Sequence, residues 1–162
     1  MKRLLVLAAA PLALAACGPA AQPAAESPPA ADQAAAVVVT DAWCRATPNG
    51  ARAGGCFATF TARTDDRLTG GSTPRAAQLQ IHEMTTEGGM MKMGPIEGGL
   101  PLPAGQAVAL APGGNHIMLM ELTQPLTDGE TVPLTLSFAA APAVTVQAQV
   151  RRVTPGGNGH HG

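Results

Sequence analysis

Apolar and polar residues alternate along much of the chain between Val37 and Val153. The alternation is clearest at 132–138 and 144–150, where every second residue is apolar, as in a strand with one buried face. Shorter segments of the same character, separated by Gly, Pro, Asn and Asp, are 37–46, 56–62, 79–84, 90–96, 107–111 and 116–122. No helical period is sustained after the N-terminus. The pattern therefore predicts an all-β domain of about eight short strands, a Greek-key sandwich or barrel.

The first residues differ from the rest of the chain. Lys2 and Arg3 precede an apolar stretch, 4–14, which is too short for a permanent membrane span. The sequence Leu14-Ala15-Ala16-Cys17 then resembles the lipobox of a bacterial lipoprotein. We expect residues 1–16 to be a signal peptide and Cys17 to be lipidated, with an ordinary secretory signal cleaved near Ala16 as the alternative. Either signal directs the protein out of the cytoplasm.

Low-complexity segments flank the predicted domain at 37–153. Residues 17–36 are mostly Ala, Pro, Gln and Ser, a composition that buries too little apolar surface to fold and is typical of a linker. Residues 154–162 form a Gly-rich tail that ends in His160 and His161. Two adjacent imidazoles could capture Cu(II), although a solvated tail without metal is the alternative.

Composition and charge exclude several classes of partner. The formal net charge is −1, and it falls to −3 without Lys2 and Arg3, so there is no basic field to attract nucleic acid. The chain has no Tyr and a single Trp43, so it also lacks a stacking platform for bases or sugars. We expect no nucleic-acid partner, and membrane attachment only through the lipid at Cys17.

Methionine and histidine cluster in one part of the predicted domain. Of seven methionines, all except Met1 lie between Met84 and Met120, and two of the four histidines lie in or beside this window. Residues two apart share a face of a strand, which groups His82 with Met84, Met91 with Met93, and His116 with Met118 and Met120. Three strands could thus bring imidazoles and thioethers to one site.

Imidazole and thioether form a soft, uncharged ligand set that favours Cu(I) over Zn²⁺ or Mg²⁺. Thioethers also suit an oxidising compartment, because they cannot form disulfides. The alternative is that the methionines fill the core of a protein that is poor in aromatic residues. Their confinement to one window favours a metal site.

Cys44 and Cys56 fall on the first two predicted strands. Outside the cytoplasm such a pair favours a disulfide, and a thiol pair for redox exchange or metal handling is the alternative.

Three other functions compete with copper handling. A blue-copper electron carrier would need a cysteine thiolate near His116 or Met118, an enzyme would need catalytic motifs that the sequence lacks, and a metal-free lipoprotein would leave the clustering unexplained.

The chain resembles the periplasmic copper chaperone family PCuAC, whose pattern is His, ten residues, Met, about twenty-one residues, then His-x-Met. Here ten residues separate His82 from Met93, and twenty-two separate Met93 from His116-Ile117-Met118. Further matches are Asp41-Ala42-Trp43 with Arg45, Thr47-Pro48, 66–68, 112–114, and Leu126, Gly129, Val132, Leu134, Leu136 and Phe138.

The resemblance implies a cupredoxin-like β-sandwich without enzymatic activity, which supplies copper for cytochrome c oxidase assembly at its CuA site. Its ligands would be His82, Met93, His116 and Met118, with Met84, Met91 and Met120 as auxiliaries. The expected partner is a copper-accepting protein of respiratory-chain assembly. We expect the protein to be a monomer, lipid-anchored in the periplasm.

Overall fold

The computed structural model describes residues 35–153, and all regular structure in this part of the chain is β. There are ten strands: β1 (Val37–Arg45), β2 (Ala53–Ala62), β3 (Asp66–Thr73), β4 (Ala76–Glu87), β5 (Met90–Pro95), β6 (Leu100–Leu102), β7 (Ala107–Ala109), β8 (His116–Leu122), β9 (Thr131–Phe138) and β10 (Val144–Arg151). Every predicted strand is present. The predicted number, eight, was too low for two reasons. β3 lacks apolar alternation because it contains Gly70 and Gly71, and β6 has only three residues, too few to show a period.

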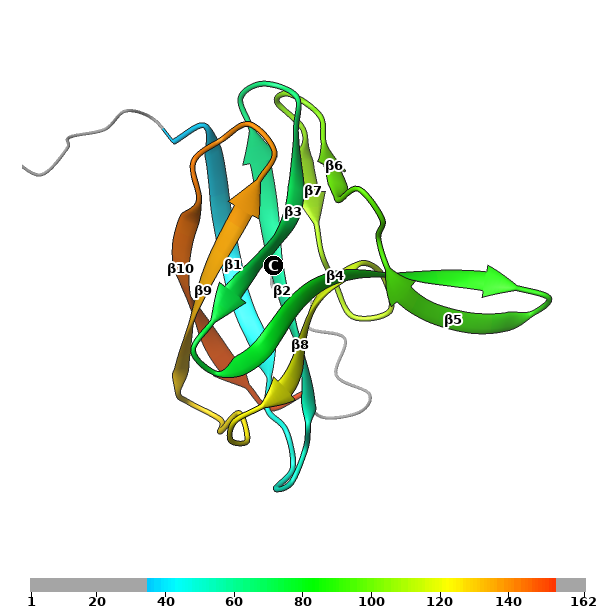
Figure 1. Ribbon diagram of the computed structural model, residues 1–162, viewed down its shortest axis with the longest axis vertical. Coiled ribbons are helices and arrows are strands. Elements are labelled where there is room, and N and C mark those ends of the chain that lie inside the picture. The colour runs from blue at the N-terminus through cyan, green and yellow to red at the C-terminus, as the bar shows by residue number, and fades with distance from the viewer. Residues whose placement is uncertain (1–34, 154–162) are drawn as a thin grey trace, which may run out of the picture. The chain divides into compact units, whose positions relative to one another are not determined.

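The strands form one sheet that closes on itself (Figure 1). Seven strands follow the order β4-β8-β2-β1-β10-β9-β3, and the pairing of β3 with β4 completes the circuit. β1 and β10 run parallel, and the other pairs of strands are antiparallel. β5, β6 and β7 are additions that pair with β4, β3 and β2, respectively. Among residues 35–153 there is no helix that is long and apolar enough to cross a membrane.

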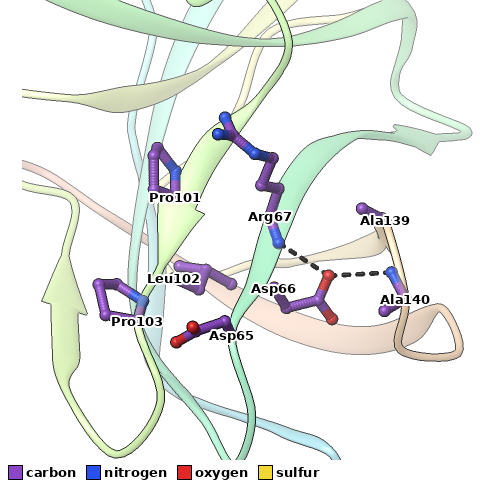
Figure 2. Close-up of a pocket in the computed structure, with 8 residues that line it drawn as sticks. All are labelled: Asp65, Asp66, Arg67, Pro101, Leu102, Pro103, Ala139 and Ala140. Carbon is purple, nitrogen blue, oxygen red and sulfur yellow. Dashed lines mark hydrogen bonds between the residues drawn. The ribbon is translucent and has the colours of Figure 1, made fainter.

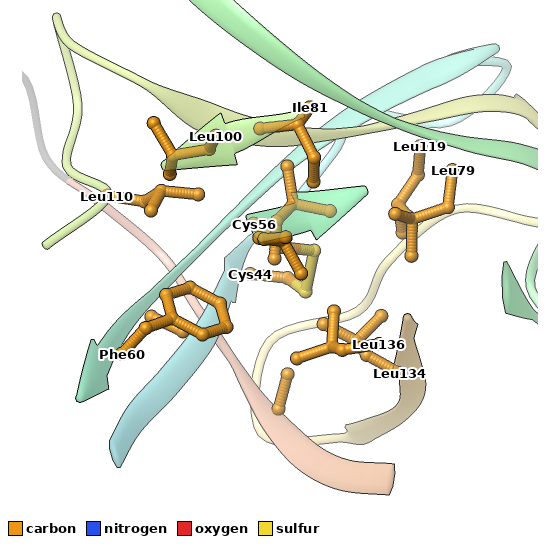
Figure 3. Packing of buried hydrophobic residues seen from close by; sticks show 14 of the residues in the cluster. Cys44, Cys56, Phe60, Leu79, Ile81, Leu100, Leu110, Leu119, Leu134 and Leu136 are labelled. Carbon is orange, nitrogen blue, oxygen red and sulfur yellow. A yellow bond between two sulfur atoms is a disulfide. The ribbon is translucent and has the colours of Figure 1, made fainter. Parts of the chain in front are cut away.

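The closed sheet surrounds an apolar core (Figure 3). Alternate residues of the predicted strands supply it, so that Leu134 and Leu136 of β9 and Ile117 and Leu119 of β8 are all buried. Cys44 and Cys56 lie directly opposite each other on β1 and β2, are fully buried and are joined by a disulfide. The thiol pair considered as an alternative is absent from this structure.

A bulge in β1 changes which side chains face outward. Thr40 pairs with Thr59 and Trp43 with Phe57, so β1 uses one more residue than β2 over this stretch. Asp41 takes up the extra length with a φ of 51°. Because side chains alternate along a strand, one inserted residue inverts the alternation. Val37 before the bulge therefore faces the core, whereas Trp43 and Arg45 after it lie on the outer face.

Candidate metal centre

The histidine and methionine segments occupy three neighbouring strands, β5, β4 and β8. His82 of β4 lies opposite His116 of β8, and Met84 of β4 lies opposite Met93 of β5. Met118 follows His116 by two residues and so shares its face of the sheet. The register between distant segments thus brings all four predicted ligands, and the predicted auxiliary Met84, to one face.

These side chains surround a small cleft of about 200 Å³. It is lined by Arg45, Gly55, Phe57, Met84, Met93, Pro112, Gly113, His116 and Met118. His82 adjoins it, because its ring centroid is 5.8 Å from that of His116. Both histidines are only 8% exposed, whereas Met93 at the mouth is 51% exposed. The cleft therefore combines two shielded imidazoles with a thioether that a partner can reach.

The hydrogen bonds of His116 fix which ring nitrogen carries a lone pair. Nδ1 lies 2.9 Å from the carbonyl oxygen of Gly114, which can only accept, so Nδ1 donates. In the neutral ring Nε2 then bears no hydrogen, and it faces the Sδ atom of Met93 at 3.1 Å. Two lone-pair donors therefore face each other at a distance at which one metal ion could bind both.

His82 is oriented by a chain of glutamines on the same face of β4. The Nε2 amide of Gln80 donates to Oε1 of Gln78 at 3.1 Å, which leaves Oε1 of Gln80 as the acceptor for Nε2 of His82 at 2.9 Å. Nδ1 of His82 then carries the lone pair, and this atom is buried without a hydrogen-bond partner. A buried acceptor without a partner is costly unless something binds it, so Nδ1 is suited to hold a metal.

The electrostatics of His82 also favour a ligand role. Burial lowers the pKa of His82 below that of an ordinary histidine, and the neighbouring charge of His116 lowers that pKa further. A metal binds the neutral imidazole, so protons compete less for His82 than for an exposed histidine. Within residues 35–153 no three His, Cys, Asp or Glu side chains gather as a possible metal site. The side chains that line the cleft beside His116 include three methionine thioethers, those of Met84, Met93 and Met118.

Other predicted residues lie away from the cleft. Met91 and Met120 share its face of the sheet but do not line it, because each is two residues beyond a lining methionine along its strand. Met90, to which the sequence assigned no ligand role, is 68% exposed on β5, which extends away from the closed sheet together with the end of β4 (Figure 1). Cys17, His160 and His161 lie outside the described residues.

Sequence reasoning assigned no role to several residues at the cleft. Phe57 lies between Trp43 and His116, with ring centroids 4.5 Å and 6.4 Å away, respectively. Gln80 could have been found from its spacing, because Gln78, Gln80 and His82 alternate along one strand. Arg45 belongs to the segment that resembles the PCuAC family, but its position beside the site depends on the bulge at Asp41.

A second cleft, of about 480 Å³, lies near the start of β3 and the end of β6 (Figure 2). Its carboxylates already have partners. Asp66 accepts hydrogen bonds from the backbone amides of Arg67, Ala140 and Ala141, and Asp65 accepts one from Ala104. These carboxylates tie loops to the sheet, so this cleft offers no comparable donor set.

Comparison with known proteins agrees with the fold and with the family resemblance. A family model named LpqE-like, which describes a lipoprotein family, matches residues 37–150, nearly all of the β domain. The chain belongs to the LpqE-like family. This LpqE-like chain is also 35% identical over 119 residues to a protein named as a lipoprotein, Lxx21020 of Leifsonia xyli subsp. xyli (strain CTCB07). The match covers 74% of the present chain and 72% of that relative.

Solved structures similar to the LpqE-like chain are PCuAC domains and a related protein. The copper-bound PCuAC domain from PmoF2 is 25% identical with a TM-score of 0.61, over 73% of this chain and 94% of that domain. The Cu(I) form of DR1885 from Deinococcus radiodurans is 32% identical with a TM-score of 0.57, over 71% of this chain and 77% of the other. The resemblance to the PCuAC family is thereby confirmed.

Proposed function

We propose that this protein is a copper chaperone that binds one Cu(I) through His82, Met93, His116 and Met118 and transfers it to an acceptor. Met84 also lines the cleft and is the auxiliary ligand best located to help. The two imidazoles and the thioethers are neutral and soft, which suits Cu(I). Two structures similar to this chain are of copper-bound forms, one of them with Cu(I), which supports the same cargo here.

One observation carries the proposal: Nε2 of His116 faces Sδ of Met93 at 3.1 Å, although the hydrogen bond to Gly114 leaves that nitrogen with a lone pair. In the neutral ring these two electron-pair donors have no hydrogen between them, and a soft cation would bind both. The nearby Nδ1 atom of His82, buried and without a partner, supplies a third donor.

The location and pathway are further parts of the proposal. A lipid on Cys17 would anchor the chain on the periplasmic side of the envelope, and residues 17–36 would let the monomeric β domain reach a membrane-bound acceptor. The naming of the family and of a relative as lipoproteins supports the anchor. The PCuAC resemblance favours cytochrome c oxidase assembly as the process that receives the copper. It also favours a cupredoxin-like Greek-key fold and a protein without enzymatic activity.

A blue-copper electron carrier is disfavoured by the cysteines of the described residues. Cys44 and Cys56 are bonded to each other inside the core, so neither offers a thiolate to the cleft. Such a carrier needs a cysteine thiolate with two histidines.

The test replaces one thioether by an isosteric hydrocarbon. Met118→Leu should weaken Cu(I) retention in competition with a Cu(I) chelator while changing the thermal midpoint little, because leucine and methionine are close in volume. Met90→Leu is the matched control, since Met90 is exposed on β5 and does not line the cleft. A sharp loss of stability with unchanged copper affinity would show that Met118 is a packing residue.

A further inference from the structure

Arg45 is a charged residue in the wall of the candidate copper cleft. It lies on the outer face of β1 because of the bulge at Asp41, and it is exposed. The ion pairs within residues 35–153 are Arg75 with Glu130 and Lys92 with Glu87, so the guanidinium of Arg45 has no carboxylate partner there. Its charge is thus available at the edge of the cleft.

A second arginine lies beside the first. Arg151 of β10 is the register partner of Arg45 in the parallel pairing of β1 with β10. Its guanidinium carbon lies 5.9 Å from the centre of the Trp43 ring, and Trp43 in turn contacts Phe57 of the cleft. Two like charges opposite each other on neighbouring strands repel. Both side chains are exposed, and Arg151 also lies over the Trp43 ring.

Acidic side chains do not offset these charges at the cleft. None lines it. Glu83 lies between His82 and Met84 in sequence, so it points to the opposite face of β4. Cu(I) on neutral ligands would add a further positive charge to the same place. A copper-loaded cleft is therefore distinctly cationic in a chain whose net charge is −1.

We propose that Arg45 and Arg151 form a docking surface for a copper acceptor whose incoming ligand is negatively charged, as a thiolate or carboxylate is. This inference rests on the proposed function and adds to it the chemistry of the partner. Opposite charge steers an acceptor toward the cleft and raises the rate of productive encounter.

Transfer follows as an exchange of ligands without a change in oxidation state. The anionic ligand enters beside Arg45 and forms a bond to Cu(I) as the bond from Cu(I) to the exposed thioether of Met93 breaks. The electron pair of that bond stays on sulfur, and the incoming anion offsets the charge of the copper. Met93 is the ligand best located to leave first, because it is 51% exposed whereas both histidines are 8% exposed.

The test compares two Cu(I) chelators that share one aromatic core, neutral neocuproine and anionic bathocuproine disulfonate. The rate at which each removes Cu(I) from the loaded chain is followed by absorbance at low ionic strength. Arg45→Gln and Arg151→Gln should each lower the ratio of anionic to neutral rates by about fivefold, the order expected for one nearby charge in water. Arg45→Lys should keep the ratio, and added salt should reduce the differences.

Arg63→Gln is the matched control, because Arg63 is exposed just after β2 and does not line the cleft. Unchanged ratios in both Arg45→Gln and Arg151→Gln, or an equal fall in Arg63→Gln, would overturn the docking surface. These outcomes leave the copper site itself intact. Failure of the wild-type chain to retain Cu(I) in the preceding loading step would instead contradict the proposed function, and the docking surface with it.

Discussion

Removal of the Gln80 amide should weaken copper binding although Gln80 is not a ligand. Gln80 accepts the hydrogen of His82 Nε2 at 2.9 Å and thereby keeps the lone pair on the buried Nδ1. In Gln80→Leu this acceptor is lost, so the ring can take the other tautomer or turn away. Loss of such an orienting partner commonly lowers metal affinity about 10- to 100-fold.

The accompanying loss of stability should be small. One hydrogen bond contributes about 0.5–1.5 kcal/mol net, and Gln80 is only half-buried, so water can reach part of the vacated space. Cu(I) affinity is measured by chelator competition, and the His82 tautomer by nitrogen-15 NMR of the copper-free chain. Gln147→Leu, at an exposed position of β10, controls for an apolar residue on a strand. Unchanged affinity together with an unchanged tautomer would refute the orienting role.

Three further predictions concern the fold around the site. The Cys44→Ala/Cys56→Ala double variant should lose about 3 kcal/mol of unfolding free energy, measured by denaturant titration. This is the entropic stabilisation expected of a disulfide that closes a short loop, here between cysteines 12 residues apart. A loss below about 0.5 kcal/mol would contradict this prediction. Asp41→Val should lower the unfolding free energy by about 1–2 kcal/mol in the same assay, because a β-branched residue disfavours a positive φ. Asp41→Gly should lower it little. Equal losses of unfolding free energy in the two variants would mean that the bulge does not require a positive φ at this position. Burial and the charge of His116 lower the pKa of His82 in the folded, copper-free chain. In the unfolded chain His82 has its ordinary pKa of about 6.5, so as the pH falls below this value the unfolded chain binds a proton at His82 before the folded chain does. Stability should therefore fall as pH decreases from 6.5 and fall less in His82→Gln, and parallel pH profiles would refute this contribution.

The alternation of apolar residues predicted most of the strands that line the core, but not β3 and β6. β9 and β10 follow it throughout, because each buries one face against the core. β3 was missed because Gly70 and Gly71 interrupt the alternation. β6 was missed because three residues are too few to show a period.

The members of the candidate site were predictable, but their arrangement was not. The two-residue spacing grouped His82 with Met84 and His116 with Met118. That His82 lies opposite His116 depends on the register of β4 with β8, strands that are distant in sequence, and no local pattern encodes it. Arg45 reaches the cleft only because one residue of β1 bulges. Three consecutive valines, 37–39, precede the bulge, so the sequence shows no clear alternation there whose inversion could be seen.

X-ray absorption at the copper edge of the Cu(I)-loaded chain identifies the atoms bound to the metal. We expect a first shell that contains both nitrogen and sulfur. The sulfur contribution should fall in Met118→Leu and stay unchanged in Met90→Leu. A first shell of only nitrogen and oxygen neighbours in the wild-type chain would contradict the proposed His and Met site.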